Sequence, residues 1–228
     1  MSNVKAPELL NPDGTASLAT TFMMSHHAFR RDLALFRAAL GELGADSARA
    51  TAILAEWKNF NGALRGHHGV EDTQVFPGVR SRHEGVGDVL DRLEADHRRI
   101  DPLLDEGDRA FAALPGSARD AHAVVDRLSA LLSAHLELEE AEVVPFMRTM
   151  TDFPPPPSDE IAGMYAGGFA WAMRGIAPEV LTRVNAMLPE SVTSRLPAAR
   201  AAYEERFRRA FGEVAVGAST TSVPGVAR

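Results

Sequence analysis

The chain has 228 residues, of which 45% are hydrophobic, and a formal net charge of −7. This length suits one domain of roughly 150 residues with an appendage, and the acidic balance excludes an electrostatic footprint for nucleic acid or an anionic membrane. The absence of cysteine excludes disulfides, thiolate metal sites and thiol nucleophiles, so histidine and carboxylate are the strong metal ligands that remain.

Long helices follow one another through the first two thirds of the chain. Over residues 17–43, apolar residues and one histidine recur every three or four positions, which predicts a helix with one face in a core. Similar stripes predict helices over about 47–75, 82–113 and 117–149, the second ending at Pro77-Gly78. Short connections between four long helices predict an all-α protein with an antiparallel up-and-down four-helix bundle over residues 15–150.

A run of four prolines follows this bundle and predicts an extended linker over residues 151–158. Shorter helices are expected over 159–175, 178–188 and 197–212, which together form a C-terminal helical extension over residues 159–212. Small and polar residues with Gly and Pro then predict a disordered tail over 213–228. No secretory signal pattern and no apolar stretch of transmembrane length is seen, so we expect a cytoplasmic protein without a membrane partner.

Each of the four long stripes contains one histidine, and three of these histidines have a carboxylate four residues later. The histidines are His26, His67, His97 and His135, and the carboxylates are Glu71, Asp101 and Glu139. Residues four apart share a helix face, so such a pair can hold neighbouring ions or bridge them. Because an unpaired buried carboxylate costs several kcal/mol, the pattern predicts a dinuclear metal site inside the bundle. The alternative is a buried polar network.

Register separates the neighbouring polar residues from these stripes. His27 and His68 each lie one residue off a stripe, which predicts that they turn toward solvent or a neighbouring helix. His83 and His122 are expected at the surface. Asp101 precedes Pro102 and is expected either as a ligand or as an acid just outside the ligands. Such outer carboxylates orient ligating histidines, and further candidates for that role are Asp72, Glu94 and Glu140.

Four motifs together resemble the hemerythrin family, specifically its bacterial HHE cation-binding branch, over about residues 17–149. They are His26-His27-Ala28-Phe29-Arg30, His67-His68-Gly69-Val70-Glu71-Asp72, Glu94-Ala95-Asp96-His97 and His135-Leu136-Glu137-Leu138-Glu139-Glu140. The resemblance implies an up-and-down four-helix bundle around a non-haem di-iron centre with an oxo or hydroxo bridge. It also implies that His26 and His67 bind one iron, that His97 and His135 bind the other, and that Glu71 and Glu139 bridge them.

The chain departs from the oxygen carriers of this family at two positions. Asp101 stands where they have a second histidine on the third helix, and Glu139 follows His135 by four residues instead of five. The resemblance implies a protein that binds or processes O2, NO or peroxide. The alternatives are an enzyme, acting by peroxide disproportionation or by O2-dependent oxidation of an organic substrate as an oxidase or oxygenase, and a metal-stabilised structural or iron-handling protein. A homodimer through the C-terminal extension is one arrangement left open.

Overall fold

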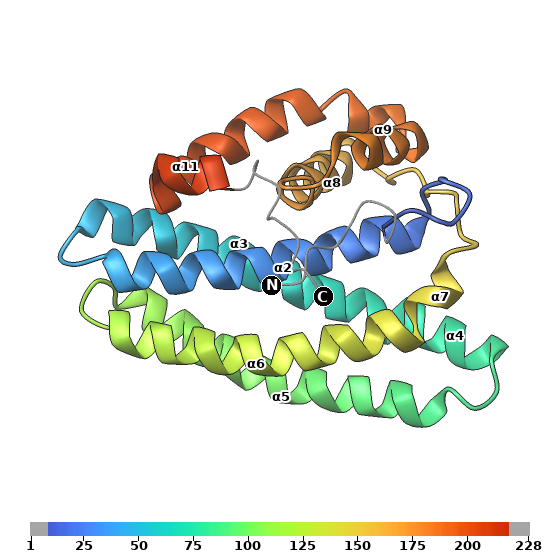
Figure 1. Cartoon of the computed structure of the whole chain (residues 1–228), viewed down its shortest axis with the longest axis horizontal. Helices are drawn as coiled ribbons and strands as arrows, with labels where there is room; N and C mark the ends of the chain where they lie inside the picture. Colours follow the sequence, from blue (N-terminus) through green and yellow to red (C-terminus); the bar gives the residue numbers. More distant parts are fainter. Residues whose placement is uncertain (1–8, 219–228) are drawn as a thin grey trace, which may run out of the picture. The chain divides into compact units, whose positions relative to one another are not determined.

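The structure, a computed structural model, describes residues 9–218, with side chains through residue 212, and this part of the chain is helical without any strand (Figure 1). The long helices are α2 (Leu18–Glu42), α3 (Ser47–Val70), α5 (Gly87–Ala112), α6 (Ala118–Glu142) and α11 (Leu196–Ala218). The shorter elements are η1 (Glu71–Val75), α4 (Phe76–Arg82), α7 (Val144–Met147), α8 (Asp159–Ala172), α9 (Pro178–Met187) and α10 (Glu190–Thr193). The predicted all-α class is confirmed.

Two compact units divide the chain. One contains the residues up to Ala28 and those from Arg148 onward, and the other contains Phe29–Met147. The division falls inside α2, which runs as one continuous helix through Ala28 and Phe29. The domain limits drawn from the sequence, 15–150 and 159–212, stay predictions.

In the unit of residues 29–147, α5 packs along α6 and against α3, and Figure 1 shows α5 and α6 running side by side. Aromatic side chains fill the core between α2, α3 and α5. Trp57 stacks on Phe111 with ring centroids 4.2 Å apart and meets Phe36 edge-on at 5.7 Å. Gly107 makes this stacking possible, because a Cβ there would lie 2.1 Å from the Trp57 ring. These three helices therefore share a packed apolar core at this level.

The end of α3 is the most irregular part of this unit. From Glu71 to Val75 the backbone forms a π-helical turn, η1, in which the N–H of Phe76 bonds to the carbonyl of Glu71. The chain then continues as α4 through Arg82, so the expected helix end at Pro77-Gly78 is wrong. Proline is tolerated in the first turn of a helix, where its missing N–H would have no partner, and Pro77 occupies such a position.

In the other unit, α8 packs against α10 and α11. Ser158 is the N-cap of α8, since its hydroxyl accepts a hydrogen bond from the N–H of Ile161 at 3.2 Å. Arg174 donates to both carboxylate oxygens of Glu204 at 2.6 Å. Gly212, with φ of 77°, interrupts α11, and residues 213–218 of the predicted tail continue this helix. The remainder of that tail lies outside the described residues.

Among residues 9–218, no helix is both long enough and apolar enough to cross a membrane.

Candidate metal centre

Three potential ligands come from the junction of α3 and η1. His67 and His68 lie in the last turn of α3, and Glu71 is the first residue of the π-helical turn. The side chain of His67 is 9% exposed, His68 is 4% exposed and Glu71 is fully buried. Consecutive residues point about 100° apart on a helix, so the two histidines can serve two neighbouring ions. This junction therefore contributes to two groups of potential ligands.

The first group of potential ligands lies entirely within the unit of residues 29–147. It contains His68, Glu71, His97 and His135, whose ligand atoms all lie within 4.8 Å of one another. The ring of His68 stacks on that of His97 at 4.0 Å and meets that of His135 at 5.4 Å. All four side chains are buried. Three imidazoles and one carboxylate thus converge from α3, η1, α5 and α6.

The second group contains His67, Glu71 and Glu139 of the same unit, again with ligand atoms within 4.8 Å of one another, while His26 belongs to the other compact unit. Glu71 belongs to both groups: its Oε1 lies 2.6 Å from Nε2 of His67, and its Oε2 lies 3.1 Å from Nε2 of His97. Glu139 is fully buried, and one of its oxygens lies 3.8 Å from Nε2 of His135. The two oxygens of Glu71 therefore face different groups, as those of a bridging carboxylate do.

A carboxylate outside the two groups orients one of the histidines. Asp72 Oδ1 lies 2.8 Å from Nδ1 of His97, which fixes the Nδ1–H tautomer and leaves Nε2 directed at Glu71. Phe76 stacks on the same ring with centroids 5.7 Å apart. The π-helical turn explains how Glu71 reaches the buried groups while the next residue reaches His97, since its wider turn offsets the side chains that follow.

The protonation states of the side chains in the first group favour binding of a cation. Burial, with a smaller contribution from the neighbouring His97, lowers the pKa of His68 to about 2, so its imidazole is neutral at physiological pH. Within the described part of the chain, neither ring nitrogen of His68 has a hydrogen-bond partner. A buried polar group without a partner is costly, and neutral imidazole is the protonation state that binds metals. His68 thus has the properties of a ligand.

Glu71 supplies the negative charge for this cation. Burial raises the pKa of its carboxyl, but the charge of His67 and the hydrogen bonds from His67 and His97 outweigh that effect and hold the pKa well below its ordinary value. The pKa of His97 is raised: burial lowers it, and the hydrogen bond and charge of Glu71, followed by Asp72, more than compensate. Several imidazoles and an ionised carboxylate form a donor set suited to a first-row transition metal.

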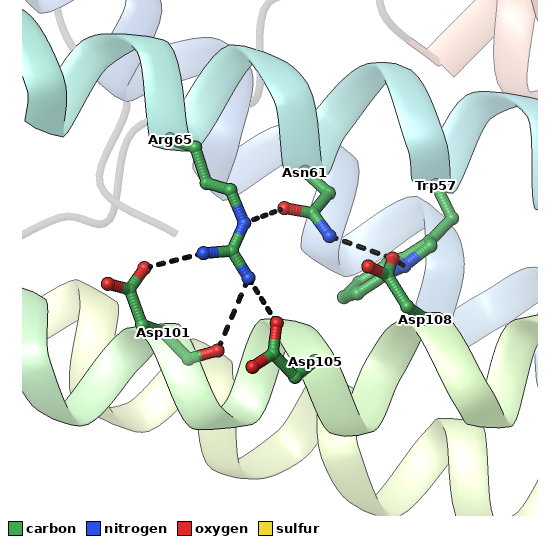
Figure 2. A network of polar contacts seen from close by, with 6 residues as sticks. All are labelled: Trp57, Asn61, Arg65, Asp101, Asp105 and Asp108. Atoms are coloured by element: carbon green, nitrogen blue, oxygen red, sulfur yellow. Dashed lines mark hydrogen bonds and ion pairs between the residues drawn. The ribbon is translucent and has the colours of Figure 1, made fainter.

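Asp101 lies outside both groups. Its side chain is 52% exposed, and its Oδ1 accepts a hydrogen bond from Nη1 of Arg65 at 3.0 Å. Figure 2 shows Arg65 between Asp101 and Asp105, with its Nη2 2.6 Å from Asp105 Oδ1. A carboxylate that is half exposed and bound to a surface guanidinium does not reach the buried histidines. The expectation that Asp101 is a ligand or the acid just outside the ligands is therefore corrected.

The sequence favoured His67 over His68 as the ligand and turned His68 toward solvent or a neighbouring helix. His68 does face neighbouring helices, where its ring contacts those of His97 and His135. Choosing only one of two consecutive histidines suits a single binding position and fails when two groups of potential ligands lie side by side. His68 is thereby the third imidazole of the first group, a role that the sequence comparison would have assigned to the position of Asp101. The two consecutive histidines, His67 and His68, were the sequence feature that could have indicated two adjacent groups of ligands.

The other outer carboxylates behave differently from one another. Asp72 contacts His97, whereas Glu94 pairs with Arg80 at 3.3 Å and Glu140 with Arg30 at 2.6 Å. His83 is exposed and stacks on Phe146, as the surface position predicted for it requires. His122 is partly buried and pairs with Asp126 on the same helix.

Comparison with known proteins agrees with this arrangement. A family model described as the hemerythrin HHE cation-binding domain matches residues 17–147. No curated protein and no solved structure matches the chain. The matched segment is more than half of the chain and contains every member of the two ligand groups. The chain therefore belongs to the hemerythrin HHE cation-binding domain family.

Proposed function

We propose that the chain is a non-haem di-iron protein that binds or processes O2, NO or peroxide. The observation that carries the proposal is the position of Glu71, whose two oxygens face His67 at 2.6 Å and His97 at 3.1 Å. A carboxylate shared by two histidine-rich groups is the arrangement that two bridged ions require. In this proposal the two groups bind one ion each, within an antiparallel up-and-down four-helix bundle.

The ligands divide unequally between the two ions. His68, His97 and His135 would hold one ion, and His26 and His67 the other, with Glu71 and Glu139 as bridges. The second ion would have one imidazole fewer from the chain, which would favour binding of a small molecule there. When bound, the metal pair supplies redox chemistry with oxygen-derived ligands, while the chain holds it and excludes bulk water.

The surroundings favour iron and small ligands. Imidazole and carboxylate donors without thiolate suit a metal that changes between ferrous and ferric states. Phe22 lies beside His26 with ring centroids 4.8 Å apart, and Phe29 lies 5.3 Å from His67. These apolar rings line the ligands with fewer imidazoles, which suits a diatomic molecule or peroxide better than a charged organic substrate.

The alternatives differ in what they require. A di-iron oxidase or oxygenase needs room for an organic substrate next to the ligands, and a structural or iron-handling protein needs metal binding without reaction. The cytoplasmic location and a homodimer through the C-terminal extension stay predictions.

Metal analysis of protein expressed in iron-replete medium tests the proposal. We expect about two irons per chain, as the two ligand groups require, and near-ultraviolet absorption bands from a bridged ferric pair. These bands should change on addition of peroxide or, after reduction, of O2 or NO. One zinc and no iron per chain, or iron whose absorption responds to none of these ligands, would contradict it.

A further inference from the structure

A continuous series of aromatic rings connects the ligand groups to the far part of the bundle. The ring of His67 contacts Phe29 at 5.3 Å, Phe29 contacts Phe60 at 5.8 Å, and Phe60 stacks on Trp57 at 5.5 Å between centroids. His67 and Trp57 are ten residues apart on α3, which is about 15 Å along the helix axis. Electron tunnelling weakens steeply with distance and with gaps, and packed rings provide a gap-free medium.

Trp57 ends this series at a carboxylate. Its indole N–H donates to Oδ1 of Asp108 at 2.8 Å, and the same oxygen accepts from Asn61 at 2.7 Å (Figure 2). A buried indole N–H needs a partner, and a neutral acceptor would be sufficient for that purpose. Here the acceptor is a carboxylate at the exposed side of α5, in contact with solvent.

The carboxylate of Asp108 accepts a hydrogen bond from Trp57 and forms no ion pair among the described residues. Arg65 belongs to the same network, but it pairs with Asp101 and Asp105 and reaches Asp108 only through the amide of Asn61. An uncompensated carboxylate stabilises positive charge on the indole and can accept its proton.

Within residues 29–147, Trp57 is also the one easily oxidised side chain that belongs to this series of aromatic rings. This stretch of sequence contains no cysteine, no tyrosine and no second tryptophan. Phenylalanine is much harder to oxidise, so Phe29 and Phe60 serve as the medium and Trp57 as the donor. The flat stack of Trp57 on Phe111, at 4.2 Å and 10° between ring planes, spreads the charge left behind by a departing electron.

We propose that Trp57 is an electron donor to the metal centre and that Asp108 accepts its indole proton. This inference rests on the proposed function, because it needs a redox-active metal pair that reacts with peroxide. Reduction of one hydrogen peroxide to two water molecules consumes two electrons and two protons. One electron would come from a bound metal ion and the other from Trp57, and solvent would supply both protons. The Trp57 N–H proton moves to Asp108, which leaves a neutral indolyl radical and a protonated carboxyl.

The second tryptophan provides an internal control. Trp57 is fully buried, whereas Trp171 in α8 is only partly buried and belongs to the other compact unit. The iron-loaded protein is treated with one equivalent of hydrogen peroxide, and oxidation of the two tryptophan-containing peptides is quantified by mass spectrometry. Peroxide attacking from solution favours the more accessible Trp171, whereas transfer to the metal centre favours Trp57. We expect several-fold more oxidation at Trp57, and none above background in protein loaded with redox-inert zinc.

Asp108→Asn tests the proton acceptor. It keeps the shape and the hydrogen bond from Trp57 but removes the charge, so Trp57 oxidation should fall by about tenfold. Asp101→Asn changes the same network at a residue that does not contact Trp57, and it should leave the yield unchanged. Iron content and the absorption spectrum of each variant show that the centre is intact.

Three results would overturn the inference while leaving the proposed function in place, provided that the iron protein consumes peroxide. They are preferential oxidation of Trp171, equal oxidation of Trp57 with iron and with zinc, and an unchanged yield in Asp108→Asn. If the iron protein does not consume peroxide but its spectrum responds to O2 or NO, the electron-donor role of Trp57 fails alone. If its spectrum responds to none of the three ligands, the proposed function fails and the role of Trp57 fails with it.

Discussion

Nδ1 of His97 lies 2.8 Å from Oδ1 of Asp72, and Nε2 of the same ring lies 3.1 Å from Glu71. One imidazole thus joins a partly exposed carboxylate to a fully buried one. Because Asp72 binds Nδ1, the other nitrogen is the one directed at Glu71 and the one that would bind a metal. The π-helical turn makes this relationship possible, since Glu71 and Asp72 are consecutive residues that contact opposite sides of one ring.

Asp72→Asn should weaken metal binding by roughly 10- to 100-fold without abolishing it, because the His97 ring loses a charged partner but keeps its position. Competition with a chelator of known affinity measures the change. Asp91→Asn is the matched control, since Asp91 is an exposed carboxylate that pairs with Arg80. Equal effects of the two variants would show that net charge matters and that the contact with His97 does not.

His68→Ala should reduce the metal content by about one ion per chain, because the first group would retain two imidazoles and the shared Glu71. His83→Ala, which removes an exposed imidazole that stacks on Phe146, should leave the metal content unchanged. Elemental analysis of both variants after identical loading with iron measures the metal content per chain. An unchanged metal content in His68→Ala would show that His68 is a core residue and not a metal ligand.

The helices were predictable because apolar periodicity directly reflects which face meets a core. The stripes predicted both ends of α2 to within one residue, the start of α5 to within five and the end of α6 to within seven, but they did not predict the π-helical turn at Glu71–Val75. In that turn the hydrogen-bond partner changes from four to five residues earlier, and no residue pattern specific to that change precedes it. Helix α4 was missed for a related reason, since Pro77 resembles a helix end but lies in a first turn.

The two groups contain five of the seven predicted metal residues, His26 lies in the other compact unit, and the two errors have one origin. Both arose from placing residues on an ideal, isolated helix. On such a helix Asp101 follows His97 on the same face, yet Arg65 on α3 reaches Asp101 and holds it at the surface. His68 is off the stripe of α3, yet it faces His97 and His135 from other helices. Contacts with other helices determine where the side chains of Asp101 and His68 lie, and the apolar periodicity of a single helix contains no information about those contacts.

Glu71→Gln should disturb both ions, because it removes the one charge that the two groups share. The amide can still bind weakly through its oxygen, so we expect less than full loss at each position and the disappearance of absorption bands from a bridged pair. Glu137→Gln, an exposed carboxylate on α6, is the control. Retention of the bridged-pair spectrum in Glu71→Gln would contradict the assignment of Glu71 as a bridge.

Asp101→His should not create a ligand, since position 101 faces Arg65 and solvent. We expect unchanged metal content and spectrum, with a stability loss of less than about 1 kcal/mol from the exposed ion pair. Metal analysis and urea unfolding of the loaded protein check both parts. A gain in metal affinity or a shifted spectrum would show that the side chain at position 101 reaches the centre after all.

Gly107→Ala should destabilise the bundle, because the added Cβ would lie 2.1 Å from the Trp57 ring and the ring would have to move. Overpacking of this kind costs about 1–3 kcal/mol. Gly62→Ala on α3 is the matched control: nothing lies within 4 Å of its Cβ position, and alanine in an open helical site should stabilise by about 0.5–1 kcal/mol. Urea unfolding followed by tryptophan fluorescence measures both variants. Because the displaced Trp57 would also lose its alignment with Asp108, Gly107→Ala should shift the Trp57 emission, whereas Gly62→Ala should not. Opposite signs of the two stability changes are the expected result, and equal stabilisation by both would mean that the close contact between Gly107 and Trp57 does not exist in solution.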